Sequence, residues 1–126
     1  GAAPLAAMLD GRLPSLRGRR VALVLCGGNI DPLVLASIIE RGMVRAGRLA
    51  RLRVSARDVP GSLAQITHTV AQAGANIDEV HHQRAFSMQS VQNVDIEMVL
   101  QTRGPAHIEQ VIAALRAAGF QAQIQG

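Results

Sequence analysis

Residues 51–57, with the sequence RLRVSAR, alternate strictly between polar and apolar side chains. Successive side chains of a β-strand point to opposite faces, so this alternation predicts a strand with one buried face and one face in water. Leu52, Val54 and Ala56 belong to the buried face. Whatever this chain folds into must therefore supply an apolar layer for one side of a sheet.

The sequence that follows supplies that layer, because helical and strand patterns alternate along it. Apolar residues three or four positions apart indicate helices, and glycines mark their ends. The expected elements are a strand over residues 51–57, a helix from Leu63 to Gly74, a strand with imperfect alternation from Ile77 to about Phe86, a polar loop over residues 87–90, a strand over residues 91–101, a helix from Pro105 to Gly119 and a strand from Phe120 to Ile124. This βαββαβ order predicts an α+β fold, the ferredoxin-like plait, with both helices on one face of an antiparallel sheet.

The plait makes the first and third strands neighbours, which predicts contacts between their polar faces. Opposite charges across two strands stabilise a sheet by ~0.2–1 kcal/mol per pair. The expected neighbours are Arg51, Arg53 and Arg57 on the first strand and Asn93, Asp95 and Glu97 on the third.

Residues 1–50 have a different pattern. We expect a short helix near residues 2–9, a connector to Arg20, and then a strand over the apolar run of residues 21–26. An uninterrupted apolar run is typical of a parallel strand buried on both faces. Asp31 is placed to cap a helix that begins at Pro32 and continues to Arg41.

A single strand, glycine turn and helix cannot cover both faces of a parallel sheet. We therefore expect two parts, residues 1–50 as the edge of a larger α/β domain and residues 51–126 as a domain of its own. The chain begins at Gly1 and its first methionine is Met8, which also favours a fragment of a longer protein.

Composition narrows the possible functions. All 13 basic residues are arginines, so no Schiff base to pyridoxal phosphate can form within these 126 residues. The lone Cys26 excludes an internal disulfide, and the adjacent His81 and His82 would point to opposite faces of a strand, so no metal site is expected. No apolar run reaches the ~20 residues of a membrane span, and no signal peptide pattern is present, which favours a cytoplasmic protein without membrane contact.

The turn between the first strand and first helix, residues 58–63 (DVPGSL), is a candidate binding loop. Pro60 fixes φ, Gly61 allows close approach of a ligand, and the N–H groups at a helix start can receive a carboxylate. Asn76, at the start of the second strand, can donate to a carboxylate and accept from an ammonium group. Spacing alone favours the alternative of a plain turn and a strand-start asparagine.

In combination, D-x-P-G-x-L at residues 58–63 and A-G-A-N-I at residues 73–77 resemble an ACT domain, a small-molecule sensor on many enzymes of amino acid metabolism. The resemblance implies an amino acid bound between two ACT domains. Asp58 would face its ammonium group, and the carboxylate would meet Asn76 and the N–H groups of Gly61, Ser62 and Leu63. The implied effector-binding residues are Asp58, Val59, Pro60, Gly61, Ser62, Leu63, Asn76 and Ile77.

The preceding part, with LCGGNID at residues 25–31, IIERG at residues 38–42 and GRL at residues 47–49, is similar to the end of the catalytic domain of threonine dehydratases (threonine ammonia-lyases). These enzymes use pyridoxal phosphate, and the resemblance places Cys26, Gly27, Gly28 and Asn29 beside that cofactor in an intact enzyme. The family usually has serine at the position of Cys26, and a thiol is a weaker hydrogen-bonding group. The family's Schiff-base lysine and phosphate loop have no counterpart here, so the chain alone is expected to hold no cofactor and to be inactive.

The resemblance implies regulation of threonine deamination to 2-oxobutanoate and ammonia, with isoleucine or valine as the effector and homo-oligomers formed through the ACT domains. Two alternatives remain. One is a dimerisation module without a ligand. The other is an RNA-binding plait, which the net charge of +4 favours but the absence of aromatic residues from residues 91–100 disfavours.

Overall fold

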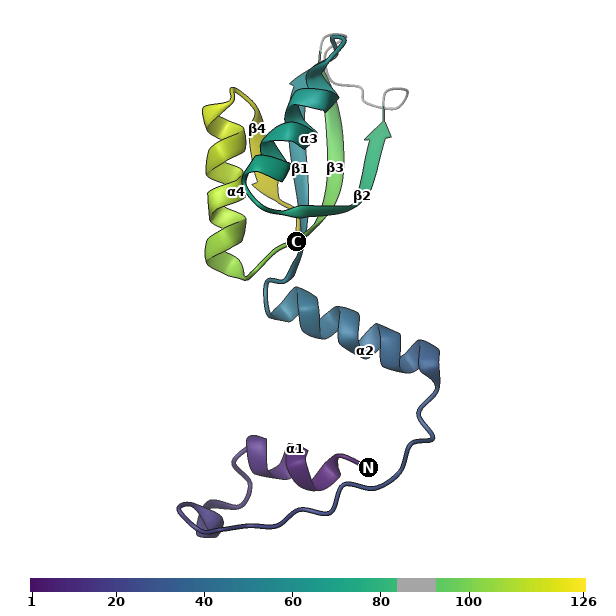
Figure 1. Ribbon diagram of the computed structural model, residues 1–126, viewed down its shortest axis with the longest axis vertical. Helices are drawn as coiled ribbons and strands as arrows, with labels where there is room; N and C mark the ends of the chain where they lie inside the picture. Colours follow the sequence, from purple (N-terminus) through teal and green to yellow (C-terminus); the bar gives the residue numbers. More distant parts are fainter. Residues whose placement is uncertain (84–92) are drawn as a thin grey trace. The chain divides into compact units, whose positions relative to one another are not determined.

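The computed structural model describes residues 1–83 and 93–126 (Figure 1). They form two compact units, Gly1–Leu35 and Ala36–Gly126. The second unit contains a four-stranded sheet and the two helices that cover it. The elements are α1 (Ala3–Leu9), the 3-10 helix η1 (Pro14–Leu16), α2 (Pro32–Arg45), β1 (Leu49–Arg57), α3 (Ser62–Gln72), β2 (Asn76–Gln83), β3 (Asn93–Gln101), α4 (Pro105–Ala117) and β4 (Gln121–Ile124).

The sheet has the strand order β2-β3-β1-β4, and every neighbouring pair is antiparallel. Figure 1 shows α3 and α4 on the same face of this sheet. The ferredoxin-like plait expected from the sequence is therefore confirmed, including the adjacency of β1 and β3. In this topology the β1–α3 and α4–β4 turns lie at one end of the sheet, and the α3–β2 and β3–α4 turns lie at the other.

The polar face of β1 meets β3 largely as expected. Arg53 lies opposite Glu97, and its Nη2 is 3.2 Å from Glu97 Oε1. Arg57 lies opposite Asn93. Arg51 departs from the expectation because the antiparallel register continues two residues beyond Glu97 and places Val99 opposite it.

The second strand contains the irregularity that its imperfect alternation predicts. Ile77 pairs with Leu100 and Glu79 with Val99, so Asp78 is an extra residue at a register shift. A bulge of this kind bends a strand and changes which face the following side chains occupy. The end of the expected strand at Phe86, the expected loop at residues 87–90 and the start of the next strand at Val91 lie outside the described residues.

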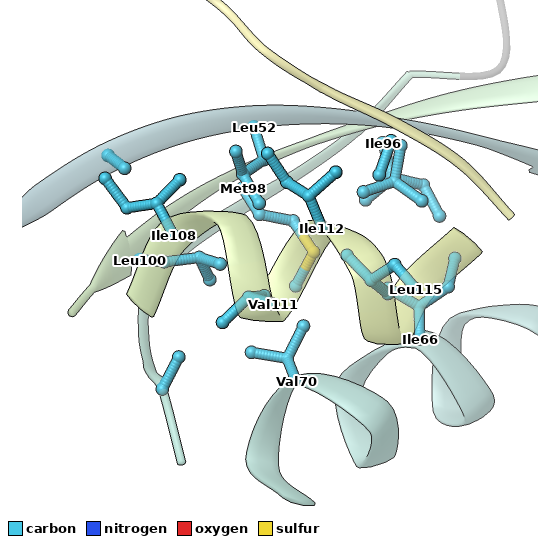
Figure 2. Close-up of a cluster of buried hydrophobic side chains, with 14 of the residues drawn as sticks. Leu52, Ile66, Val70, Ile96, Met98, Leu100, Ile108, Val111, Ile112 and Leu115 are labelled. Carbon is cyan, nitrogen blue, oxygen red and sulfur yellow. The ribbon is translucent and has the colours of Figure 1, made fainter. Parts of the chain in front are cut away.

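The hydrophobic core lies between the sheet and the two helices. Figure 2 shows side chains of both helices meeting those of the strands. Leu52 and Val54 of β1 and Ile96, Met98 and Leu100 of β3 supply the sheet side, and Ile66, Val70, Ile108, Val111, Ile112 and Leu115 supply the helix side. These are the apolar positions that the alternation and the helical spacing predict.

In the first unit, the expected short helix is confirmed as α1. Asp31 also caps α2 as expected, since its Oδ1 accepts a hydrogen bond from the Leu33 N–H at 2.7 Å. The expected strand over residues 21–26 is wrong, because residues 20–31 contain no strand and Val24 is 78% exposed. A parallel strand needs hydrogen-bonded neighbours on its edges, and no described strand pairs with this segment.

The core position of Leu115 predicts a large cost on truncation. Leu115 is fully buried on α4, so Leu115→Ala should lower the free energy of unfolding by about 2–5 kcal/mol, through lost burial and the cavity that remains. Leu33→Ala is the matched control in another helix, at a side chain that is 81% exposed, and should change it by less than about 0.5 kcal/mol. Urea unfolding followed by circular dichroism measures both, and equal effects would contradict this description of the core.

Candidate functional site

The β1–α3 turn is held by hydrogen bonds to one carbonyl group at the end of β1. The Val59 N–H donates to the Arg57 carbonyl oxygen at 2.9 Å, and the Ser62 hydroxyl donates to the same oxygen at 2.9 Å. The Ser62 N–H donates to the Val59 carbonyl oxygen at 3.2 Å. These bonds fold the segment into a tight loop that leads directly into α3.

Gly61 is the N-cap of α3, with a φ of +92° in the left-handed region. No side chain among the described residues caps this helix start. The first N–H groups of a helix have no partner within the helix and attract anions. The Ser62 N–H is already bonded to the Val59 carbonyl oxygen within the turn.

A depression of about 460 Å³ opens beside this turn. Val59 and Ser62 are the expected site residues that line it, and Asp58, Pro60 and Gly61 are exposed next to it. The other lining residues come from the end of β1, the start of β3, α3 and the α4–β4 turn: Ser55, Ala56, Arg57, Gln65, Asn93, Ala118, Gly119, Phe120 and Gln121.

Sequence reasoning missed the contribution of the α4–β4 turn. The plait topology places this turn at the end of the sheet where β1 ends and α3 begins. Phe120 and Gln121 could therefore have been found from the strand order, although nothing in their local sequence marks them as site residues.

Leu63 and Ile77 have a structural role in addition to their expected place at the site. Both are partly buried and pack against the hydrophobic core. Their side chains help to fix α3 and β2 on the sheet.

Asn76 lies at the opposite end of the domain from the β1–α3 turn. It pairs with Gln101, the last residue of β3, whereas Arg57 just before the turn pairs with Asn93, the first residue of β3. The 11 residues of α3 separate the two places, about 16 Å at 1.5 Å per residue. One copy of the chain does not bring Asn76 to the turn.

The residues implied in cofactor binding lie together in one exposed segment of the first unit. Cys26, Gly27, Gly28 and Asn29 are exposed and belong to the segment without helix or strand. A pyridoxal phosphate site also needs a lysine for the Schiff base, and none occurs in the sequence.

The remaining titratable groups offer no metal centre in the part of the chain that is described, where no three His, Cys, Asp or Glu side chains cluster. His81 Nε2 lies 3.2 Å from Glu79 Oε2 on β2. None of the described helices combines the length and apolar character that a membrane crossing requires.

The left-handed conformation of Gly61 gives a stability prediction. An added Cβ would meet no atom within 4 Å, so strain of the backbone alone should make Gly61→Ala less stable by about 1–2 kcal/mol. Gly42→Ala is the control, because Gly42 lies inside α2 without a positive φ, and alanine favours a helix. Thermal unfolding compares the two variants, and an unchanged stability of Gly61→Ala would contradict the conformation of the turn.

Two L-threonine ammonia-lyases are similar to this chain in sequence. Over 120 residues, 95% of its length, the chain is 41% identical to the L-threonine ammonia-lyase of Geobacter sulfurreducens. Over all 126 residues it is 35% identical to that of Thermotoga maritima. It spans only 30% and 31% of these two relatives, matching their C-terminal part.

The prephenate dehydratase of Staphylococcus aureus shares the fold. The TM-score is 0.50 at 20% identity, covering 62% of this chain and 29% of that one. Residues 47–119 match the ACT domain, and this range contains both sheet-covering helices and three of the four strands. Since that match covers more than half of the sequence, the chain belongs to the ACT domain family and is related to the C-terminal part of threonine ammonia-lyases.

Proposed function

We propose that this chain is the amino-acid-sensing regulatory part of an L-threonine ammonia-lyase. The observation that carries the proposal is the similarity to two L-threonine ammonia-lyases over 95% and 100% of the chain. Threonine deamination itself would take place in a larger protein, with pyridoxal phosphate supplying the chemistry. Residues 1–50 would contribute the edge of that catalytic domain, and Cys26, Gly27, Gly28 and Asn29 would approach the cofactor there.

The β1–α3 turn supports the sensing role through its capacity to hold a carboxylate. The start of α3 carries no side-chain cap among the described residues, and its glycine N-cap leaves the approach open. The positive end of the helix dipole favours an anion at this point. Arg57, which lines the adjacent depression, adds a positive charge close by. Asp58 provides a carboxylate for the ammonium group of the same amino acid.

The second half of the proposed site would come from another copy of the chain. β2 is an edge strand of the sheet, and edge strands present unpaired backbone groups that can join a second chain. A two-fold axis that aligns two β2 edges antiparallel brings Asn76 of one copy to the end of the sheet where the other copy begins α3. The separation of Asn76 from the turn in a single copy is therefore compatible with a site shared between two copies.

The effector class follows from this arrangement. Polar groups at the helix start and at Asn76 would hold the two charged ends of an amino acid. Its side chain would lie against Val59, which is 53% exposed beside the turn, and against Phe120 across the depression. An aliphatic, branched side chain such as that of isoleucine or valine has the matching chemistry.

Isothermal titration calorimetry of the chain with isoleucine, valine, threonine and serine tests the sensing role. Protein concentration is measured by refractive index, because the sequence contains no Trp or Tyr. We expect saturable binding of isoleucine or valine and weaker binding of serine, which lacks apolar area to bury. A stable dimer that binds none of the four would instead indicate a dimerisation module.

Asn76→Ala tests the two-copy site. Loss of a hydrogen bond to a charged group contributes about 1.5–3 kcal/mol, so the effector Kd should rise about tenfold or more. Thermal stability should stay unchanged, because Asn76 is exposed. Gln110→Ala removes a comparable exposed amide from α4 and is the control. Equal Kd values for the two variants would exclude Asn76 from the site.

A further inference from the structure

Thr102 and His107 are the only polar side chains buried among the described residues, at 9% and 5% exposure. Both belong to the segment that leads from β3 into α4. Buried polar groups are retained where they have hydrogen-bond partners, and no buried side-chain nitrogen or oxygen in the described ranges lacks one. The partners of these two residues therefore show what the segment holds together.

His107 connects the β3–α4 turn to the end of α3. Its Nδ1 accepts a hydrogen bond from the Arg103 N–H at 3.1 Å, and its Nε2 donates to the Ala73 carbonyl oxygen at 2.8 Å. A carbonyl oxygen only accepts, and an N–H only donates, so these bonds select the neutral ring with its proton on Nε2. Ala73 stands three residues before Asn76.

A second contact joins the same two turns. Gly74 has a φ of +80°, and its position leaves room for the Arg103 guanidinium, whose Nη1 would be 3.2 Å from an added Cβ. The β3–α4 turn thus meets the α3–β2 turn through His107 and through Arg103. The backbone that leads to Asn76 therefore has two neighbours in the β3–α4 turn, His107 at Ala73 and Arg103 at Gly74.

Thr102 connects the same segment to the linker between α2 and β1. Its hydroxyl donates to the Gly47 carbonyl oxygen at 2.5 Å, and its N–H donates to the Arg48 carbonyl oxygen at 2.9 Å. Pro105 also packs closely against Gly47, since a Cβ added to Gly47 would be 2.8 Å from Pro105 Cδ. The linker is therefore fastened to the turn by its backbone and by close packing.

We propose that residues 102–107 couple effector binding at the α3–β2 turn to the linker at Gly47 and Arg48. This proposal rests on the proposed function, because the event that it couples to the linker is the binding of an amino acid at Asn76. Both contacts are made by one six-residue segment, so a change in the position of the Ala73 carbonyl group alters the geometry at Thr102. Coupling between two places is reciprocal, so a change in the linker also alters the turn that carries Asn76.

The first test needs no effector and compares variants by residue-resolved amide hydrogen exchange. His107→Leu removes both side-chain hydrogen bonds, and His107→Gln keeps a donor and an acceptor. We expect His107→Leu to accelerate exchange at Ala75 and also at Arg48, by about fivefold or more. His107→Gln should restore both rates to within about twofold.

Two further variants keep this test independent of general destabilisation. Ile66→Ala opens the core away from the turn and should raise exchange without singling out Arg48. Thr102→Val removes the hydroxyl but keeps the branched shape, and it probes the coupling from the opposite side should His107→Leu fail to fold. It should accelerate exchange at Ala75, although the hydroxyl that it removes bonds to Gly47 in the linker.

The second test adds the branched-chain amino acid that calorimetry identifies. In the unaltered chain it should slow exchange at Ala75 and Arg48, each by about fivefold. In Thr102→Val it should still slow exchange at Ala75 but slow it less at Arg48, because the hydroxyl bond to Gly47 is lost while the backbone bond to Arg48 remains. Thr67→Val is the matched control, because the Thr67 hydroxyl donates to the Ala64 carbonyl oxygen within α3.

The outcomes separate the coupling from the sensing role. If the amino acid binds and protects Ala75 but leaves Arg48 unchanged in the unaltered chain, the coupling is wrong and the sensor stands. If no amino acid binds while the effector-free variants behave as expected, the sensor is wrong and the mechanical connection stands. If His107→Leu affects Ala75 alone, or His107→Gln restores nothing, the coupling through this segment is overturned.

Discussion

The antiparallel pairing of β1 with β3 is the interaction on which the rest of the structure depends. Nine residue pairs join the two strands, from Leu49 opposite Gln101 to Arg57 opposite Asn93. Each strand then offers its second edge to an outer strand, and the pair supplies most of the apolar surface that α3 and α4 cover. Because the two strands are joined by α3 and β2 rather than by a hairpin, their pairing also fixes the path of everything between them.

Most of this arrangement could be predicted from the sequence because each element has a local pattern that agrees with its tertiary role. One topology is favoured by the strict alternation in β1, by the helical spacing in α3 and α4 and by the glycines at the helix ends. Agreement of this kind between local patterns allows a fold to be predicted from its sequence. The irregularity near Asp78 was also visible as imperfect alternation. The residue opposite Arg51 on β3 could not be predicted, because the register depends on how the two strands pair and not on either strand alone.

The apolar run of residues 21–26 shows the limit of local patterns. Its composition describes a strand buried on both faces, but a strand exists only where another strand accepts its hydrogen bonds. The described residues supply no such neighbour, and Val24 and Leu25 remain exposed.

Only the part of the candidate site that has a local sequence pattern could be predicted. The turn at residues 58–63 has a recognisable sequence, whereas Phe120 and Gln121 enter the depression only through the topology of the sheet. The buried contacts of Thr102 and His107 likewise join residues up to 55 positions apart, which no spacing rule could reveal.

The close approach of Gly47 to Pro105 has a consequence for protein engineering. A natural place to transplant this domain onto an unrelated enzyme is the link between α2 and β1. A graft point after Gly47 would remove the residue whose carbonyl oxygen bonds to Thr102 and which packs against Pro105. A residue with a side chain at position 47 would clash with Pro105 and displace the linker. The transferable unit therefore begins before Gly47, and a chimera that preserves this glycine keeps the hydrogen bonds from Thr102 to the linker.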